Sequence, residues 1–324
     1  MTKTSPDHAF VDDPRNENIK IGIRNGMSMK FEIFHRAEAN ISVFDSSVLL
    51  GDGIWEGMRA KLGNIQFAKE HLKRLYESAN ALWIDIGITP KEMLQLLYDT
   101  IDANEGMSED TNVHIRLVVS RGLKKTPYQG LSANIGKATI IIIPEYKKID
   151  PDSQKQGISL ITSWVRRGNS DTKDEQWNHL SKATDVSASI SASMVGADGA
   201  LMLDNNGFVK TCNATNFFIV RDGELWTATK DNIMRGITRQ KTIDCAKIEG
   251  ITVRETNFTL TDVYNAEEAF CTGTFAGQVH VKSVDGHLIG NGCSGPLTKR
   301  INLRYEQMSL ENTSRSRLST LSEI

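Results

Sequence analysis

Cysteine is scarce in this sequence. The 324 residues contain four cysteines, Cys212, Cys245, Cys271 and Cys293, which are widely spaced and form no C-x-x-C pair. This spacing argues against a zinc ribbon and against the disulfide framework of a small secreted domain. We therefore expect free, buried thiols in a reducing compartment, and no metal site.

Long hydrophobic runs are also missing. The longest strongly apolar stretch, residues 138–144, has the length of a strand and is far too short to span a bilayer. The first residues, MTKTSPDHAFVDDPRNE, are polar and lack the apolar core of a signal peptide. These features predict a cytoplasmic protein that does not contact a membrane.

No charge of one sign dominates the chain. The sequence has 38 Lys and Arg against 40 Asp and Glu, a formal net charge of -2. A nucleic-acid-binding protein normally carries a basic excess, so we expect no nucleic-acid partner. The length of 324 residues is sufficient for two domains of ordinary size, each with its own core.

The first half of the chain alternates predicted helices and strands. Thr89, Pro90 and Glu92 form a capping-box start, which predicts a helix over 90–103. Apolar spacing predicts a helix within 67–83 and paired strands between residues 30 and 48. Further strands are expected at 113–120 and 138–144, before a polar linker at 145–156.

The second half combines short strands with helices. We predict strands at 158–164, 253–258 and 269–272, and helices at 181–195, 238–249 and 297–308. This mixture favours an α+β fold. The predicted organisation is an N-terminal arm (1–18), a small N-terminal domain (19–150), a larger C-terminal domain (151–311) and a frayed tail (312–324).

A Gly-Ile-Thr-Arg turn at 236–239 leads into one of the predicted helices. Such turns leave backbone N–H groups unpaired at the helix start, where they suit an anion such as phosphate. A phosphate-binding turn downstream of a lysine suggests a phosphorylated aldehyde cofactor held as a Schiff base.

Five motifs in a fixed order carry a family resemblance. They are GDGIWEGMR (51–59), HLKRL (71–75), NFFIV (216–220), GITR (236–239) and TGT (272–274). With them, the chain resembles the class IV, fold-type IV pyridoxal-phosphate enzymes, which include branched-chain and D-amino-acid aminotransferases and aminodeoxychorismate lyase. The resemblance covers roughly residues 40 to 305.

The resemblance implies a fold and an assembly. The fold would have a small N-terminal α/β domain and a larger α+β pseudobarrel domain, with pyridoxal 5'-phosphate in the cleft between them. Family members are usually homodimers, so we expect a homodimer. The expected activity is amino-group transfer between an amino acid and a 2-oxo acid, of branched-chain or D-amino-acid type.

The resemblance also implies site residues. Arg59 would bind the cofactor phosphate, as would the backbone of Ile237, the backbone and hydroxyl of Thr238, and the turn at Thr274. Thr211 and Asn216 would line the ring of the cofactor.

The lysine that holds the cofactor is less well defined. Family spacing places it near position 178, where this chain has Asn178. Lys182 is followed by a predicted helix, as expected of the catalytic lysine. The stretch around Lys173 resembles the corresponding part of (R)-selective amine transaminases, but Lys173 lies among acidic residues. Three alternatives stay open: Lys182, its rival Lys173, or no catalytic lysine.

Thr211 is a second departure from the family pattern. The family places a glutamate there, five residues before Asn216, to keep the pyridine nitrogen protonated. A threonine hydroxyl can only hydrogen-bond to a neutral ring nitrogen. This favours a weaker electron sink, and it leaves open a lyase or racemase activity. A non-catalytic relative that binds a small amino or keto acid is the other alternative.

Overall fold

The computed structural model describes residues 10–149 and 155–324, which form two compact units. The N-terminal unit comprises residues 12–148, 177–181 and 309–324. The C-terminal unit comprises residues 10–11, 149–176 and 182–308, apart from 150–154. Most of the predicted arm (residues 1–9) and the start of the predicted second domain (151–154) lie outside the described residues. Each unit is described by itself below.

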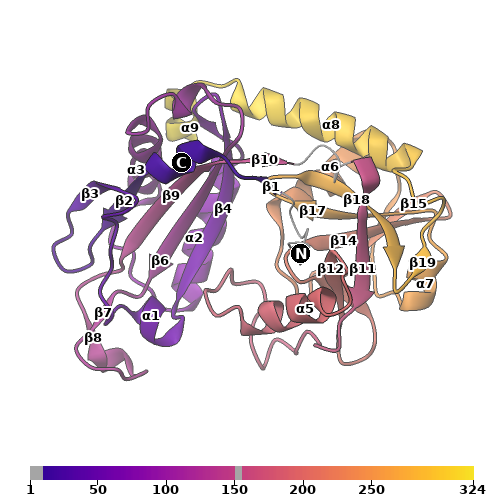
Figure 1. The fold of residues 1–324 in the computed structure, drawn as a ribbon, viewed down its shortest axis with the longest axis horizontal. Coiled ribbons are helices and arrows are strands. Elements are labelled where there is room, and N and C mark those ends of the chain that lie inside the picture. Colours follow the sequence, from indigo (N-terminus) through magenta and orange to yellow (C-terminus); the bar gives the residue numbers. More distant parts are fainter. Residues whose placement is uncertain (1–9, 150–154) are drawn as a thin grey trace. The chain divides into compact units, whose positions relative to one another are not determined.

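The N-terminal unit is built on a six-stranded antiparallel sheet (Figure 1). The strand order is β3 (Phe31–His35), β2 (Lys20–Arg24), β9 (Ile140–Tyr146), β6 (Val113–Ser120), β4 (Gly53–Lys61) and β5 (Asn64–Ile65). Helices α2 (Ala68–Ala81) and α3 (Pro90–Asp102) pack on the sheet. The remaining elements of this unit are η2 (Pro14–Asn18), α1 (Ser46–Leu50), η3 (Met107–Glu109), β7 (Leu123–Lys124), η4 (Leu131–Ala133), β8 (Asn134–Ile135) and α9 (Arg317–Glu323).

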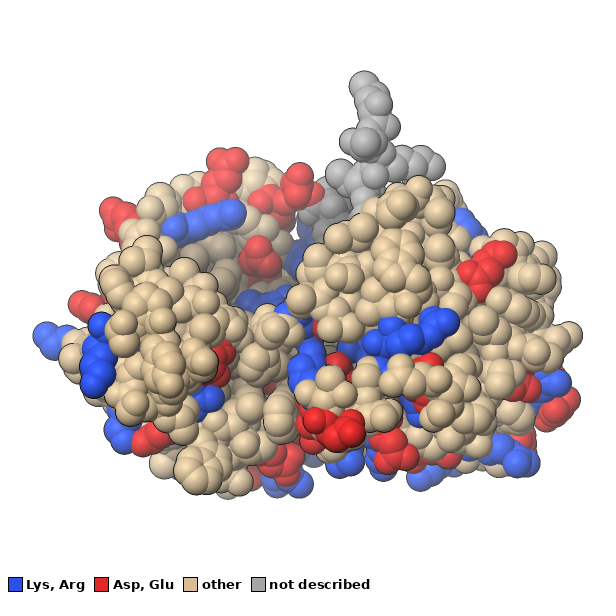
Figure 2. All heavy atoms as spheres, turned by 90° about the horizontal axis from the view of Figure 1, so that it is seen from below, with Lys and Arg blue, Asp and Glu red and all other residues tan. Residues whose placement is uncertain are grey.

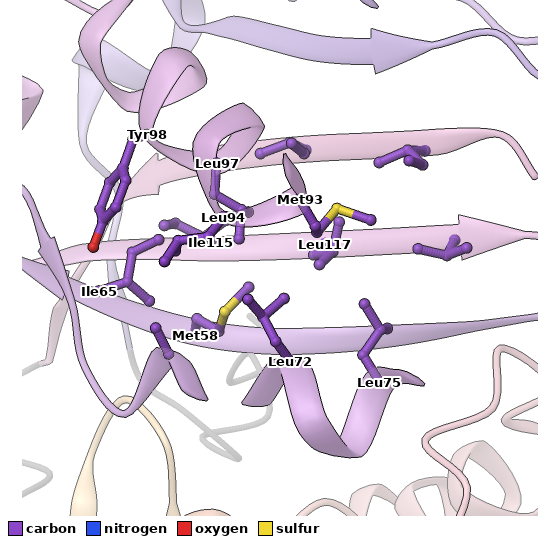
Figure 3. Packing of buried hydrophobic residues seen from close by; sticks show 14 of the residues in the cluster. Met58, Ile65, Leu72, Leu75, Met93, Leu94, Leu97, Tyr98, Ile115 and Leu117 are labelled. Carbon is purple, nitrogen blue, oxygen red and sulfur yellow. The ribbon is translucent and has the colours of Figure 1, made fainter. Parts of the chain in front are cut away.

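Alternation along these strands creates the core of the N-terminal unit. Met58 lies opposite Ile115 in the β4–β6 pair, so both side chains are on one face of the sheet. Leu72 of α2 and Leu94 of α3 pack in the same cluster, and all four are essentially inaccessible to solvent (Figure 3). The predicted capping box is confirmed, because Thr89 Oγ1 accepts from the Glu92 N–H and Glu92 Oε2 accepts from the Thr89 N–H.

Two of the five sequence motifs meet in this core. Glu56, from the first motif, is completely buried and accepts hydrogen bonds from Arg74 at 2.6 and 2.8 Å. His71 Nδ1 lies 2.7 Å from Glu56 Oε2. Burial acts to raise the pKa of Glu56, but Arg74 and His71 outweigh burial and hold this pKa below its usual range. These motif residues therefore join β4 to α2.

The C-terminal unit contains a closed ring of strands. Its sheet runs β13 (Val209–Cys212), β12 (Gly199–Leu203), β11 (Ile158–Thr162), β18 (Gly277–Val284), β17 (Glu268–Gly273) and β14 (Asn216–Arg221). A further pairing of β13 with β14 closes these six strands, as in a pseudobarrel. The sheet continues from β14 into β15 (Glu224–Thr227) and β16 (Val253–Glu255), and β19 (His287–Leu288) pairs with β18.

Helices complete the C-terminal unit: α5 (Ala183–Ser193), α6 (Ile237–Ile248), α7 (Leu260–Tyr264) and the first part of α8 (Pro296–Thr313). The short strands β1 (Phe10–Val11) and β10 (Lys148–Ile149) lie where the chain passes from one unit to the other. In the described part of the chain, no helix is both long and apolar enough to cross a membrane. Acidic and basic side chains are interspersed among uncharged ones on the face drawn in Figure 2.

Several expectations differ from the structure. Between residues 30 and 48 there is one strand of the predicted pair, and α1 follows because Asp45 caps it by accepting from the Ser47 N–H at 2.9 Å. In the region predicted to be a frayed tail, Arg317 of α9 donates two hydrogen bonds to Asp102. Cys293 is exposed rather than buried.

Candidate active site

The start of α6 is the best-defined part of the candidate site. Gly236 caps this helix and has no side chain with which to bond the first N–H groups. Asn216 Nδ2 donates to the Met234 carbonyl at 3.0 Å, which fixes the turn that precedes the helix. A Cβ atom at position 236 would lie 2.2 Å from Asn216 Oδ1. A larger residue here would have to displace the Asn216 side chain, whereas glycine leaves the helix start open to an anion.

A row of polar residues crosses the sheet beside this turn. Thr211 of β13 lies opposite Asn216 of β14, and Asn216 lies opposite Thr272 of β17. The Thr272 hydroxyl is buried and has no hydrogen-bond partner within the described residues. Thr274 lies two residues further on, in the loop between β17 and β18. Asn216 thus links Thr211, the turn before α6 and the strand that leads to Thr274.

Within the GITR motif, the residues have different environments. Ile237 and Thr238 are the first two residues of α6, where backbone N–H groups have no partner inside the helix. Arg239 is buried and donates to the Ala228 carbonyl and to Glu255 Oε2, at 2.7 and 2.8 Å. Arg239 therefore anchors the first turn, while the N-terminal N–H groups point along the helix axis.

A buried ion network surrounds Arg167. Its Nη1 donates to Glu175 Oε2 at 3.0 Å, its Nη2 donates to Asp185 Oδ1 at 2.6 Å, and its Nε donates to the Thr211 hydroxyl at 3.1 Å. Each carboxylate has a second cation, because Lys173 Nζ lies 3.3 Å from Glu175 and Lys182 Nζ lies 3.4 Å from Asp185. With Lys182 protonated, three cations face two carboxylates and the network has a net charge of +1; with Lys182 deprotonated, the network is neutral.

Lys182 immediately precedes α5 and lies at the edge of this network. Burial lowers the pKa of Lys182 below its ordinary value of 10.5. Asp185 acts in the opposite direction, whereas Arg167 and Lys173 lower the pKa further. A lysine that forms a Schiff base needs a deprotonated amine, so this environment suits that chemistry.

Arg59 belongs to the N-terminal unit and lies on β4. It is opposite His114, which in turn is opposite Glu145, so the three side chains share the sheet face that does not bear the core. Arg59 Nη2 donates to Asn112 Oδ1 at 2.6 Å. Two residues along β6, the Arg116 guanidinium stacks on the Trp55 ring at 3.7 Å on the same face.

Asn178, at the position where family spacing predicts the lysine, also belongs to the N-terminal unit. Its carbonyl accepts from the Trp55 N–H at 2.9 Å. The side chain is 2% exposed, and Oδ1 accepts no hydrogen bond within the described part of the chain. Asn178 is therefore buried and polar, but it carries no amine.

Sequence reasoning missed two arginines. Arg167 follows β11, and a parallel bridge with Asp204 holds its backbone, so only the fold brings it to Thr211. Arg116 alternates with apolar residues of β6, a pattern that could have shown it on the sheet face that does not bear the core. No sequence pattern indicated that Cys212 Sγ and Cys271 Sγ lie 3.4 Å apart.

The fold and these motifs define a class of protein. Residues 53–284 match the model of the family described as amino-transferase class IV. This match covers more than half of the chain, and the chain belongs to that family. Its fold is the fold-type IV architecture expected above, and its activity class is that of a pyridoxal-phosphate-dependent aminotransferase.

Named relatives agree with this family. A putative branched-chain-amino-acid aminotransferase of Methanocaldococcus jannaschii is 40% identical over 275 residues, which is 84% of this chain and 92% of the relative. A D-alanine aminotransferase of Bacillus licheniformis is 27% identical over 88% of this chain and 97% of its own length. A T.th. branched-chain amino acid aminotransferase, crystallised with pyridoxamine 5'-phosphate, has a TM-score of 0.81 and 27% identity, with 93% of this chain and 96% of that chain covered.

The residues present fit pyridoxal 5'-phosphate, the cofactor of this family. The glycine-capped start of α6 suits its phosphate, and the Lys182 amine of lowered pKa suits its aldehyde. The polar row from Thr211 to Thr272 offers hydroxyls rather than the carboxylate expected of the family at position 211.

Proposed function

We propose that this protein transfers an amino group between a branched-chain amino acid and a 2-oxo acid. The observation that carries the proposal is the start of α6, where Gly236 leaves the helix N–H groups open and Asn216 fixes the turn. Branched-chain substrates are favoured over D-alanine because a relative named for them is 40% identical, against 27–31% for D-alanine aminotransferases.

The chain's residues have separate roles in this proposal. The cofactor, when bound, supplies an aldehyde and an electron-withdrawing ring. Ile237, Thr238, Thr274 and Arg59 are the residues proposed to bind its phosphate. Thr211 and Asn216 line the ring.

Lys182 is our choice for the lysine that holds the cofactor and moves the substrate proton. Its position directly before α5 and the lowered pKa of its amine support it over Lys173. Lys173 lies beside Glu175 and is proposed to balance the charge of that carboxylate rather than to react.

Arg116 is our candidate for binding the substrate carboxylate. It lies on the same sheet face as Arg59, and stacking on Trp55 fixes its guanidinium plane. Burial lowers the pKa of Arg116 from its ordinary value, which indicates a partly desolvated cation that an anion would stabilise.

The proposal includes a homodimer in the cytoplasm. On α5, Val186, Ile190 and Met194 recur every four residues and are 56%, 51% and 73% exposed, which forms an apolar stripe suited to a second copy of the chain. None of the four cysteines, all within the described residues, forms a disulfide, as expected in a reducing compartment.

The test combines chemistry with kinetics. Borohydride reduction of the protein loaded with pyridoxal phosphate, followed by peptide mass mapping, should place the adduct on Lys182. Transfer from L-leucine to 2-oxoglutarate should be faster than transfer from D-alanine. A specific adduct on Lys173 would move the reactive lysine, and the absence of any adduct and any transfer would reject the proposal.

Matched variants sharpen this test. Lys182→Ala should abolish both the adduct and amino-group transfer while the protein remains folded by circular dichroism. Lys173→Ala should retain the adduct on Lys182. An active Lys182→Ala protein would contradict the assignment of this lysine.

A further inference from the structure

The Thr211 hydroxyl accepts one hydrogen bond and leaves its own hydrogen unpaired within the described residues. Its oxygen accepts the Nε–H of Arg167 at 3.1 Å, and its hydrogen has no acceptor within residues 10–149 and 155–324. A threonine hydroxyl has a single hydrogen to donate. Donation to a ligand acceptor satisfies this hydrogen, whereas accepting from a ligand on the remaining lone pair would leave the hydrogen unpaired at a buried position, so donation is the favoured interaction.

Arg167 cannot easily release this hydroxyl. Its guanidinium is buried, and Glu175 and Asp185 bind the two terminal nitrogens from different sides. An arginine remains protonated in proteins, so its Nε is always a donor. Rotation away from Thr211 would break two buried ion pairs, which is strongly unfavourable.

We propose that Arg167 is a positioning residue that directs the Thr211 O–H toward the ring nitrogen of the cofactor. This nitrogen then accepts a hydrogen bond and stays unprotonated. The inference rests on the proposed function, in which Thr211 lines the cofactor ring.

Electrostatics also favour an unprotonated ring nitrogen. Arg167 is a permanent positive charge hydrogen-bonded to Thr211, and a nearby positive charge disfavours protonation of a ring nitrogen. An unprotonated ring withdraws less electron density from the substrate. The chain would therefore depend more on Lys182 for proton transfer than relatives with a carboxylate at this position.

The test is ¹⁵N NMR of the protein loaded with pyridoxal phosphate labelled at the ring nitrogen. We expect the resonance of unprotonated pyridine in the natural protein from about pH 6 to about pH 9, where carboxylates and arginines keep their charges. Thr211→Glu should move the resonance to that of protonated pyridine, because a carboxylate stabilises the protonated form.

Variants of Arg167 separate its positioning from a merely structural role. Arg167→Met removes the charge and the Nε–H, so the pH at which the ring nitrogen becomes protonated should rise. Arg167→Lys retains the charge and serves as a second variant if Arg167→Met does not fold, and its shift should be smaller but in the same direction. Arg166→Met is the matched control, since Arg166 is exposed and donates to the Ser163 carbonyl.

Thr211→Val should leave the nitrogen unprotonated and weaken cofactor binding by about three- to tenfold, the effect of losing one hydrogen bond. A protonated nitrogen in the natural protein, with cofactor bound and amino groups transferred, would overturn this inference and leave the proposed function standing. A protein that binds no pyridoxal phosphate overturns both.

Discussion

Two helices of the C-terminal unit begin in opposite ways. At α8, Glu268 of β17 accepts from the N–H groups of Leu297 and Thr298 at 2.9 and 2.8 Å, and from the Thr298 hydroxyl at 2.6 Å. At α6, the corresponding place is next to Gly236, which has no side chain. The start of α8 is capped by a carboxylate of the chain itself, whereas the cap residue of α6 makes no side-chain hydrogen bond.

The same strand serves both helix starts. Glu268 is the first residue of β17, whereas Thr272 and the loop to Thr274 are at its other end, and α6 packs on this strand. The need to stabilise unpaired N–H groups is common to both. One requirement of helices is thus met by an internal anchor at α8 and, in the proposed function, by a bound phosphate at α6.

The largest effect, on stability, should come from removing the Glu268 carboxylate that caps α8. Glu268→Ala leaves buried N–H groups at α8 without a partner, so we expect the free energy of unfolding to fall by about 3 kcal/mol. Urea unfolding measures this change. The exposed neighbour provides a control, since Glu267→Ala should alter stability by less than about 0.5 kcal/mol. Equal losses in the two variants would contradict the role of Glu268.

The second largest effect, on cofactor affinity and stability, should come from adding a side chain at Gly236, at the start of α6. Gly236→Ala introduces a Cβ that must displace Asn216, so the turn shifts and pyridoxal phosphate affinity should fall by about tenfold or more, with a stability loss of about 1–2 kcal/mol. Fluorescence titration and urea unfolding measure the two quantities. Gly168→Ala, where the nearest atom is 3.5 Å away, is the control and should change neither much. Unchanged cofactor affinity in Gly236→Ala would place the phosphate elsewhere.

Giving α6 its own anion should make it resemble α8. Thr238→Asp puts a carboxylate in the first turn, so the cofactor-free protein should gain about 0.5 kcal/mol of stability while pyridoxal phosphate binding weakens by charge repulsion. Thr238→Asn, of similar size but uncharged, is the control and should lose less affinity. If Thr238→Asp binds the cofactor as tightly as the natural protein, the helix start does not hold the phosphate.

The smallest effect, on the pKa of Lys182, should come from a change at the start of α5. In α5, Asp185 lies in the first turn and raises the pKa of Lys182, against the larger lowering by burial. Asp185→Asn removes this contribution, so the Lys182 pKa should fall further and the amine should become neutral at lower pH. The rate at which the cofactor-free protein reacts with pyridoxal phosphate, followed by absorbance as a function of pH, should therefore show a midpoint moved to lower pH. A midpoint moved to higher pH would contradict this assignment.

Much of the fold followed from local sequence signals. The Thr89 capping box and the Gly-Ile-Thr-Arg turn predicted the starts of α3 and α6 correctly, because helix caps are specified by adjacent residues. The family motifs predicted the class of fold. Residues near Asp45 were assigned to a strand, because their alternating apolar residues concealed a helix cap.

The parts that could not be predicted depend on distant contacts. Arg167 is 44 positions from Thr211 in the sequence, and only the ring of strands brings them together. Likewise, Glu56 and Arg74 belong to separate motifs, and nothing in either motif shows that they form one buried ion pair. The roles of Lys182, Lys173 and Asn178 stay predictions for the same reason.

The N-terminal unit contains the last residues of the chain, and this determines when its packing can be completed during synthesis. This unit includes residues 309–324, whose Asn312 accepts from the Phe67 N–H at 2.7 Å and whose Leu321 and Ile324 pack on the core. A ribosome makes these residues after the entire C-terminal unit. The N-terminal unit therefore emerges first but completes its packing last, and in the cell a chaperone would meet it with part of its core still uncovered.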